Sequence, residues 1–229
     1  AGPKAPWRMD AFYRGARRDR DILMDRGKPV GGKFSFDADN RKRWPGTPVA
    51  PTPLRFTVDA ITAEVGTLVE ARYASHPGAL DLGAIAATAD DVASAWRWAR
   101  AECLPTFGPF EDAMATRSPT LFHTLISGLV NLHRLLPRDV VADALADDLP
   151  LASQEGFVRQ VLGWREFVHH VHDATDGFRT VADAITTGAP LPPAYWGMPS
   201  GMRCLDTVVD EVWRTGYSHH ITRLMVLSN

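Results

Sequence analysis

The spacing of apolar residues after residue 56 is the feature that most constrains the fold of this chain. Val58, Ile61, Val65 and Leu68 recur at three- or four-residue intervals, with Glu64 on the opposite face, and this period is typical of an α-helix. No segment shows the apolar–polar alternation of a half-buried strand. The chain is therefore predicted to be mostly α-helical, with further helices at 8–26, 90–104, 120–136, 138–147, 153–173, 178–187, 203–215 and 218–228.

A stretch rich in Gly and Pro separates the first expected helix from the others. It contains Gly27, Pro29, Gly31 and Gly32, and it continues through several prolines between residues 44 and 53. Such density of Gly and Pro predicts an irregular surface connection. We therefore divide the chain into a connecting segment with one helix, residues 1–55, and a helical domain, residues 56–229.

Charge is distributed unevenly between these two parts. Residues 1–55 carry 13 Lys or Arg against 6 Asp, whereas the remainder carries 12 basic and 21 acidic residues. A basic segment beside an acidic body suggests a surface that faces a polyanion such as nucleic acid. A solvated linker with internal salt bridges explains the charge equally well.

Composition excludes several classes of protein. No apolar run approaches the ~18–20 residues of a membrane span, and the start of the chain lacks the apolar core of a secretory leader. Two cysteines far apart, Cys103 and Cys204, form no disulfide framework and indicate a reducing compartment. We expect a cytoplasmic protein without a membrane partner.

Two helical segments carry residues suited to an anionic, planar ligand. Gln160 and Trp164 lie four residues apart and share a face, with Arg165 beside them. A guanidinium binds phosphate or a ring carbonyl, and an indole stacks on a ring. In the expected helix 120–136, Thr124 and Ser127 lie three apart and could bond a phosphate or the preceding turn. For Gln160, Trp164 and Arg165 the alternative is a half-buried helix in which Arg165 and Glu166 form a surface pair.

Histidine-rich segments offer a second kind of chemistry. His169, His172 and Asp173 are possible metal ligands, although only His169 and Asp173 have the four-residue spacing that one ion requires on a helix. His219 and His220 are adjacent in an otherwise apolar segment, and a buried imidazole needs a partner. That partner is a ligand or, alternatively, a backbone carbonyl.

Taken together and in this order, the motifs resemble the photolyase and cryptochrome family, in particular its iron–sulfur bacterial branch of photolyase-related proteins and prokaryotic (6-4) photolyases. The resemblance covers nearly the whole chain and rests on long strings of residues: Met9-Asp10-x-Phe12-Tyr13-Arg14, Lys28-Pro29-Val30-Gly31-Gly32-Lys33, Phe107-Gly108-x-Phe110-x-Asp112, Glu155-Gly156-Phe157-x-Arg159-Gln160 and Tyr217-x-His219-His220-Ile221-x-Arg223.

The resemblance implies a role for individual residues. It implies an FAD-binding helical domain in which Thr124, Leu125 and Ser127 hold the diphosphate and Gln160, Trp164 and Arg165 line the cofactor. Catalytic roles fall on His219, His220 and Asp112: a histidine protonates the lesion, and Asp112 lies at the lesion pocket. Trp196 belongs to the electron-transfer chain, and Cys204 is one of four ligands of a 4Fe–4S cluster.

The implied function is light-driven, flavin-dependent repair of UV photoproducts in DNA, (6-4) or related lesions, by a monomeric carbon–carbon lyase. Residues 1–55 would be the basic interdomain connection. An N-terminal domain with an antenna chromophore, the other three cluster cysteines and the last flavin-lining segment are not in the sequence. Leu125 replaces the Arg of the usual phosphate-binding motif. We therefore expect a fragment truncated at its C-terminus, inactive, without the cluster and retaining FAD poorly.

Two alternatives remain open from the sequence. A cryptochrome, a blue-light photoreceptor without repair activity, would use the same flavin pocket to signal to a partner protein. A helical metal-binding protein would instead use His169, His172 and Asp173 together with His219 and His220. Repair of UV-damaged DNA separates the first alternative from the enzyme, and metal analysis separates the second.

Overall fold

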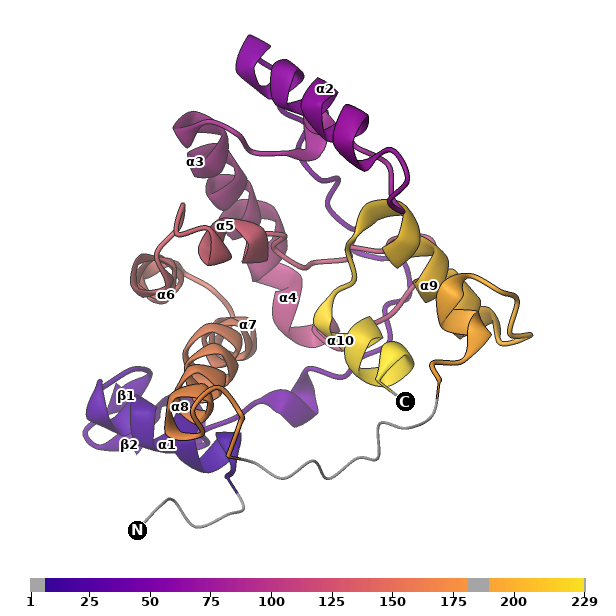
Figure 1. Ribbon diagram of the computed structural model, residues 1–229. Helices are drawn as coiled ribbons and strands as arrows, with labels where there is room; N and C mark the ends of the chain where they lie inside the picture. The colour runs from indigo at the N-terminus through magenta and orange to yellow at the C-terminus, as the bar shows by residue number, and fades with distance from the viewer. Residues whose placement is uncertain (1–6, 181–189, 229) are drawn as a thin grey trace.

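The protein has a mostly α-helical fold, as the apolar period predicts (Figure 1). The computed structural model describes residues 7–180 and 190–228. The expected helix at 178–187 falls largely on residues outside these ranges. The α-helices are α1 (Met9–Asp19), α2 (Ala60–Tyr73), α3 (Ala89–Trp98), α4 (Leu104–Phe110), α5 (Ser127–Asn131), α6 (Pro137–Ala146), α7 (Leu151–Val158), α8 (Glu166–Ala174), α9 (Arg203–Thr215) and α10 (His220–Thr222).

Wider π-helical stretches extend several of these helices. They are η4 (Ala99–Cys103) between α3 and α4, η5 (Arg159–Arg165) between α7 and α8, and η7 (Arg223–Leu227) after α10. The chain is therefore helical without a break from 89 to 110 and from 151 to 174. The shorter elements are the antiparallel pair β1 (Met24–Asp25) and β2 (Lys28–Pro29), and the 3-10 turns η1 (Val30–Gly32), η2 (Asp37–Asp39), η3 (Leu82–Ala84) and η6 (Pro193–Trp196).

Local signals explain where several helices begin. Thr88 and Asp91 form a capping box: the Asp91 amide donates to Thr88 Oγ1 at 3.1 Å, and the Thr88 amide donates to Asp91 Oδ2 at 2.9 Å. This arrangement satisfies two of the amides that a helix start leaves free. Pro137 is the first residue of α6, where its missing N–H costs nothing.

Close packing of α4 against α7 builds the centre of the molecule. A Cβ added at Gly108 would lie 2.6 Å from the backbone nitrogen of Ser153, so only glycine allows the two helices to approach this closely. The Gly108 amide also donates to Ser153 Oγ at 2.9 Å. The main core cluster surrounds this contact and contains Trp96, Ala99, Leu104, Phe107, Ile126, Val130, Val140, Ala144 and Phe157.

The first helix is shorter than the expected span 8–26 because the backbone turns after α1. Asp21 and Leu23 adopt left-handed φ values of 53° and 52°, which an α-helix does not contain. The buried Arg17 guanidinium holds this turn by donating to the carbonyls of Ile22 and Leu23, at 3.1 and 2.6 Å, and of Phe34 at 2.7 Å. The connection after α1 therefore contains a small hairpin as well as irregular backbone.

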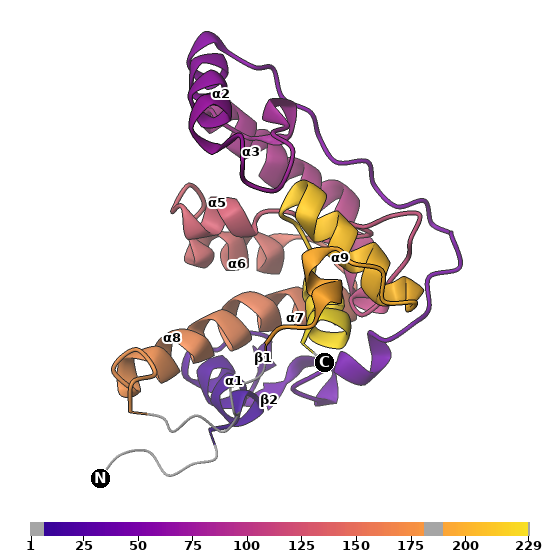
Figure 2. The same cartoon turned by 45° about the vertical axis from the view of Figure 1, so that its right-hand side comes forward.

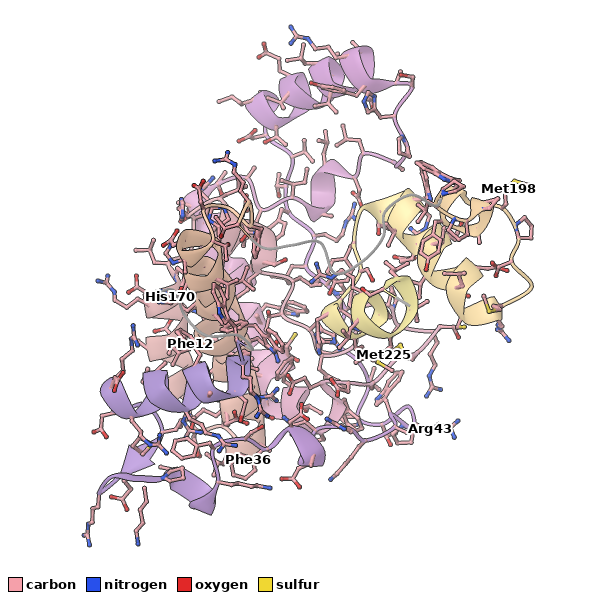
Figure 3. All side chains as sticks on the ribbon, turned by 60° about the horizontal axis from the view of Figure 1, so that its bottom comes forward. Phe12, Phe36, Arg43, His170, Met198 and Met225 are labelled. Atoms are coloured by element: carbon pink, nitrogen blue, oxygen red, sulfur yellow. The ribbon has the colours of Figure 1, made fainter. Side chains whose placement is uncertain are left out.

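Helix α1 packs on the body of the protein rather than standing apart from it. It contacts η5 and α8, and the rings of Phe12 and His170 lie 5.3 Å apart (Figure 3). A second core cluster joins Tyr13 and Ala16 of α1 to Val141, Val158 and Leu162. This packing fixes residues 9–19 against the helix that carries Gln160.

The expected helix 120–136 is wrong on both sides of a short central helix. Only Ser127–Asn131 is helical, and residues 121–126 form a loop in which Leu121 and Leu125 have φ values of 44° and 59°. Neither residue is a glycine, so the sequence gives no signal for these left-handed positions. The loop is nevertheless well packed, because Leu121 and Phe122 are buried with Ala113 in a third cluster.

Helix α2 lies at one end of the molecule, away from α1 and α8 (Figures 1 and 2). Its predicted apolar residues are largely exposed, at 72% for Ile61 and 51% for Val65. Gly66 is the residue buried within this helix, against Leu82 of η3. Across residues 7–180 and 190–228, no helix has both the length and the hydropathy to cross a lipid bilayer.

Candidate functional site

A cavity of about 350 Å³ lies between the loop before α5, the α7–η5 helix and the start of α10. We call it the histidine cavity because three imidazoles contribute to its wall. Its lining residues are Phe107, His123, Thr124, Leu125, Ile126, Ser127, Val130, Asn131, Phe157, Gln160, Val161, Arg165, Tyr217, Ser218, His219, His220 and Arg223. Its size is within the ~300–1,000 Å³ usual for small-molecule sites.

Most of the residues singled out from the sequence meet in this cavity. Segments far apart in the chain supply them: Thr124, Leu125 and Ser127, then Gln160 and Arg165, and finally His219 and His220. The predicted helical arrangement of Thr124 and Ser127 is wrong, because Thr124 is in the loop and Ser127 is the first residue of α5. Both still face the same cavity, so the loop brings them together in place of a helix face.

Asp112 and Trp164 line a second space, which we call the adjoining cavity. It measures about 610 Å³ and shares Gln160 and His220 with the histidine cavity. Its other lining residues are Met9, Asp10, Tyr13, Ser35, Asp37, Arg41, Glu111, Met114, Arg159, Ile221, Leu224 and Met225. The predicted set is therefore divided between two neighbouring cavities with a common wall.

The π-helical form of η5 explains why Trp164 is separated from Arg165. In an α-helix, Gln160 and Trp164 would share a face, as we expected. In a π-helix the repeat is wider and the backbone hydrogen bonds join residues five apart, so Arg165 comes closer to the side of Gln160 than it would in an α-helix. Gln160 and Arg165 therefore line the histidine cavity together, whereas Trp164 lies on the other side and is 46% exposed.

His219 and His220 lie at the entry to α10 rather than in mid-helix. His219 has extended backbone, with φ −71° and ψ 167°, and His220 is the first helical residue. The change in backbone conformation directs the two rings differently. His219 is 4% exposed, while the His220 Nε2 atom lies 3.3 Å from Asp112 Oδ1 in the wall between the cavities.

A third histidine, His123, completes the cluster and was not predicted as a site residue. Its ring stacks on His219 with centroids 4.3 Å apart and an interplanar angle of 16°, and its centroid lies 5.3 Å from that of His220. His123 Nε2 and His219 Nδ1 are buried without a hydrogen-bond partner. In the sequence, the one indication that His123 belongs to the site is its position directly before Thr124.

The electrostatics of the cluster favour neutral rings. Burial lowers the pKa of His123 well below its usual value, and the nearby charges of His219 and His220 lower it further. Burial is the largest cause of a lowered pKa at His219, and repulsion from His220 and Arg223 adds to it. Together they lower this pKa to about 4. At neutral pH both rings are therefore uncharged, and each has one donor and one acceptor nitrogen.

A buried ion network lies beside the cavities and was not predicted from the sequence. The Arg159 guanidinium is 3.2 Å from Glu111 Oε2, 3.3 Å from Glu155 Oε1 and 3.3 Å from Asp37 Oδ1. The Asn40 amide donates to Glu111 Oε2 at 2.9 Å, and Gln160 donates to Glu111 Oε1. Burial raises the pKa of Glu111, and the charge of Arg159 opposes this change. The network fixes Gln160 in the common wall.

Trp196 and Cys204 lie outside both cavities. Trp196 is 64% exposed in η6, and its ring centroid is 6.1 Å from that of Trp213. Cys204 is exposed in α9 beside a separate cavity of about 340 Å³. Cys103 is buried, and burial raises its pKa to about 12, which disfavours a thiolate ligand.

The histidine-rich end of α8 forms a surface pair rather than a site. His169 Nε2 lies 3.4 Å from Asp173 Oδ2, and both side chains are about 60% exposed. Among the described residues, the group whose ligand atoms come close enough for one metal ion is His123, His219 and His220, within 4.8 Å of one another. This group shares only His219 and His220 with the metal site considered from the sequence.

The fold is a mostly helical domain with two adjoining cavities, and comparison with known proteins gives its family. Residues 1–83 match the family model described as deoxyribodipyrimidine photo-lyase-related protein. The chain is 34% identical over 230 residues to a (6-4) photolyase of Agrobacterium fabrum, covering 96% of this chain. A segment of 35 residues is 51% identical to an uncharacterized protein of Acanthamoeba polyphaga mimivirus, covering 15% of this chain and 18% of that protein. The chain belongs to the photolyase-related family.

The match to the Agrobacterium protein extends over 44% of that protein's length. The chain therefore spans less than half of this relative. The predicted family membership and helical fold are confirmed.

Proposed function

We propose that this chain forms the flavin-binding part of a light-driven enzyme that repairs UV photoproducts in DNA, specifically (6-4) lesions. The observation that carries the proposal is the histidine cavity itself. Seven residues chosen from the sequence for flavin or lesion chemistry line one cavity, although they come from three distant segments. Similarity to a protein named (6-4) photolyase supports the choice of reaction.

The residues of the histidine cavity suit the two chemically different parts of FAD. The hydroxyls of Thr124 and Ser127 and the guanidinium of Arg165 would hold the diphosphate. The unpartnered ring nitrogens of His123 and His219 suit a neutral heteroaromatic ring, because each ring offers a donor and an acceptor. The bound flavin would supply an electron to the lesion after it absorbs light.

An iron–sulfur cluster does not fit the residues of this chain alone. The two cysteines, Cys103 and Cys204, are fewer than the four thiolates that a 4Fe–4S cluster uses, and Cys103 is buried. A cluster would need thiolates from outside this chain, and we propose Cys204 as one of its ligands. Trp196 as an electron carrier also remains a proposal; its nearest ring partner is Trp213.

His220 is the residue best placed to give a proton to a lesion in the adjoining cavity. Its Nε2 atom is 3.3 Å from the Asp112 carboxylate, which is itself 3.8 Å from the Arg41 guanidinium. The carboxylate orients the imidazole ring in the wall between the two cavities. A damaged base must leave the duplex stack to reach this wall, and the adjoining cavity of about 610 Å³ provides space for it.

Basic side chains near the adjoining cavity would hold the DNA backbone. Lys42 and Arg43 are exposed, and Arg43 extends from the body of the molecule in Figure 3. They follow Arg41, which lines the cavity. Contacts from Lys and Arg to phosphates supply most of the sequence-independent affinity for DNA.

Repair of a (6-4)-containing oligonucleotide under blue light by the full-length gene product, with reduced FAD present, tests the proposal, because the 229-residue chain alone is expected to be inactive. We expect repair, and we expect His220→Ala to lower its rate by about 100-fold or more, as removal of a general acid does. His169→Ala, in the exposed pair with Asp173, is the matched control and should leave the rate unchanged. Light-dependent flavin reduction without repair would contradict the proposal and favour a photoreceptor.

A metal site is the second candidate, because ligand atoms of His123, His219 and His220 lie within 4.8 Å of one another. The stack of His123 on His219 argues against it. With rings 16° from parallel, the in-plane lone pairs point side by side instead of converging on one ion. Zinc or iron at one per chain, with no saturable binding of FAD, would favour the metal site.

A further inference from the structure

His123 is held in a fixed orientation by the structure around it. Its backbone amide donates to the Thr120 carbonyl at 2.9 Å, and its carbonyl accepts a hydrogen bond from Cys103 Sγ at 3.7 Å. On one side its ring meets the edge of Phe107, with centroids 5.8 Å apart, and on another it stacks on His219. A side chain fixed in this way presents its nitrogen atoms at a defined place in the wall.

Two of the four ring nitrogens of this stack are buried without a hydrogen-bond partner among the described residues. His123 is 8% exposed and His219 is 4% exposed, and both line the histidine cavity. His123 Nε2 and His219 Nδ1 are buried without a hydrogen bond. Buried polar groups in folded proteins are almost always bonded, so two such atoms at one cavity wall indicate a ligand.

The charge around the stack limits the chemistry of that ligand. His220, Arg223 and Asp112 are the charged or titratable groups that act on His219, and His219 and His220 act on His123. Because burial and the neighbouring positive charges keep both stacked rings neutral, the stack offers neutral donors and acceptors. A neutral heteroaromatic ring with nitrogen and carbonyl groups matches this pattern, whereas phosphate is better matched by Arg165 in the same cavity.

We propose that His123 is a further ligand-binding residue of the histidine cavity, which hydrogen-bonds a heteroaromatic ring of FAD while stacked on His219. This inference rests on the proposed function. Both the isoalloxazine and the adenine of FAD have the required chemistry. The stack therefore recognises a neutral ring, and Arg165 with Thr124 and Ser127 recognises the diphosphate.

Titration with FAD and with ADP, followed by flavin fluorescence and calorimetry, tests the inference in His123→Phe. Phenylalanine keeps an aromatic ring against His219 and Phe107 but removes both nitrogens. One neutral hydrogen bond is worth about 2- to 10-fold in affinity, so we expect FAD to bind about 5-fold more weakly. A parallel loss for ADP assigns the contact to adenine, and an unchanged ADP affinity assigns it to isoalloxazine.

Controls keep the two proposals separate. His133→Phe replaces an exposed histidine and should bind FAD like the unmodified protein. His123→Gln restores a donor and an acceptor, so it should recover most of the affinity even if His123→Phe folds poorly. Equal FAD affinity in the unmodified protein, His123→Phe and His123→Gln would overturn the inference alone. Absence of saturable FAD binding in the unmodified protein would overturn the proposed function and the inference with it.

Discussion

Two buried polar clusters meet at η5, and they differ in whether their polar atoms have partners. In the ion network, Arg159 lies between Glu111, Glu155 and Asp37, and the two charged atoms without a hydrogen bond, Arg159 Nε and Glu155 Oε1, face each other at 3.3 Å. Asn40 Oδ1 is the one remaining buried atom of this network without a partner. In the histidine cavity, His123 Nε2 and His219 Nδ1 face no partner at all.

This difference distinguishes buried polar groups that stabilise the fold from buried polar groups that are placed to bind a ligand. Charges that are buried and paired hold segments together, since their partners are part of the fold. The ion network does this for residues 37–40, which it ties to α7 and η5. Buried atoms without partners are retained at a cost in stability of about 1–3 kcal/mol each, which a bound ligand would offset.

Arg159→Met should be the most destabilising of these substitutions. It leaves Glu111 and Glu155 buried without their counter-charge, and loss of one partner of a buried ion pair costs about 3–5 kcal/mol. Urea unfolding measures the change. Arg179→Met is the matched control, because Arg179 pairs with Asp176 at 3.4 Å on the surface and is 79% exposed; its effect should stay within about 0.5 kcal/mol. Equal costs for the two variants would show that the network is not structural.

Acid should destabilise the histidine cavity selectively. The pKa of His219 is about 4 in the folded protein and about 6.5 when unfolded. Between these values the unfolded state binds more protons, so stability is complete above pH ~6.5 and falls as the pH drops toward 4, by about 3 kcal/mol. His219→Asn should reduce this pH-dependent loss, and the remainder should come from His123, whose pKa is also lowered by burial.

Free energies of unfolding at pH 7.5 and pH 4.5 provide the measurement for this prediction. His76→Asn, a change at an exposed histidine, should retain the pH dependence of the unmodified protein. If His219→Asn retains it too, the imidazole is not held neutral by its surroundings, and the contrast between the two clusters fails.

Gly108→Ala should disturb both clusters together, at a cost of about 1–3 kcal/mol. The added Cβ would lie 2.6 Å from the Ser153 backbone nitrogen and 2.8 Å from the Ala152 carbonyl carbon, so α4 must move away from α7. Helix α4 carries Phe107 toward the histidine cavity, and Glu111 of the ion network follows it directly. Gly128→Ala is the control, because its Cβ would meet open space. Equal thermal unfolding of the two variants would contradict this packing.

Much of the fold could be predicted because periodic helices carry their own signal. The helix around Gln160 and Arg165 was expected from its apolar spacing and was found at 151–174. The π-helical widening that separates Trp164 from Arg165 has no such signal, since the apolar spacing of this segment also fits an α-helix. The apolar residues of α2 recur at helical spacing and so predict a buried face, but they are exposed. Their exposure depends on which elements pack against α2, and the sequence of the helix does not give this.

The candidate site was predictable residue by residue but not as an arrangement. Thr124, Leu125 and Ser127 were identified by type and order, yet the loop that positions them depends on left-handed conformations at Leu121 and Leu125. His123 joins His219 only through tertiary structure, so the stack was not visible in the sequence. The Arg159 network was missed because Glu155 and Arg159, four apart, resemble an ordinary surface pair.

The central claim is that the histidine cavity holds the flavin, and histidine NMR tests it most directly. The chain has eight histidines, of which His123, His219 and His220 line the cavity while His76, His133 and His169 are exposed. With ¹⁵N-labelled histidine and saturating FAD, we predict shifts of the ring signals of the first three and none for the exposed three. Unchanged cavity signals, or shifts confined to the exposed histidines, would contradict the claim.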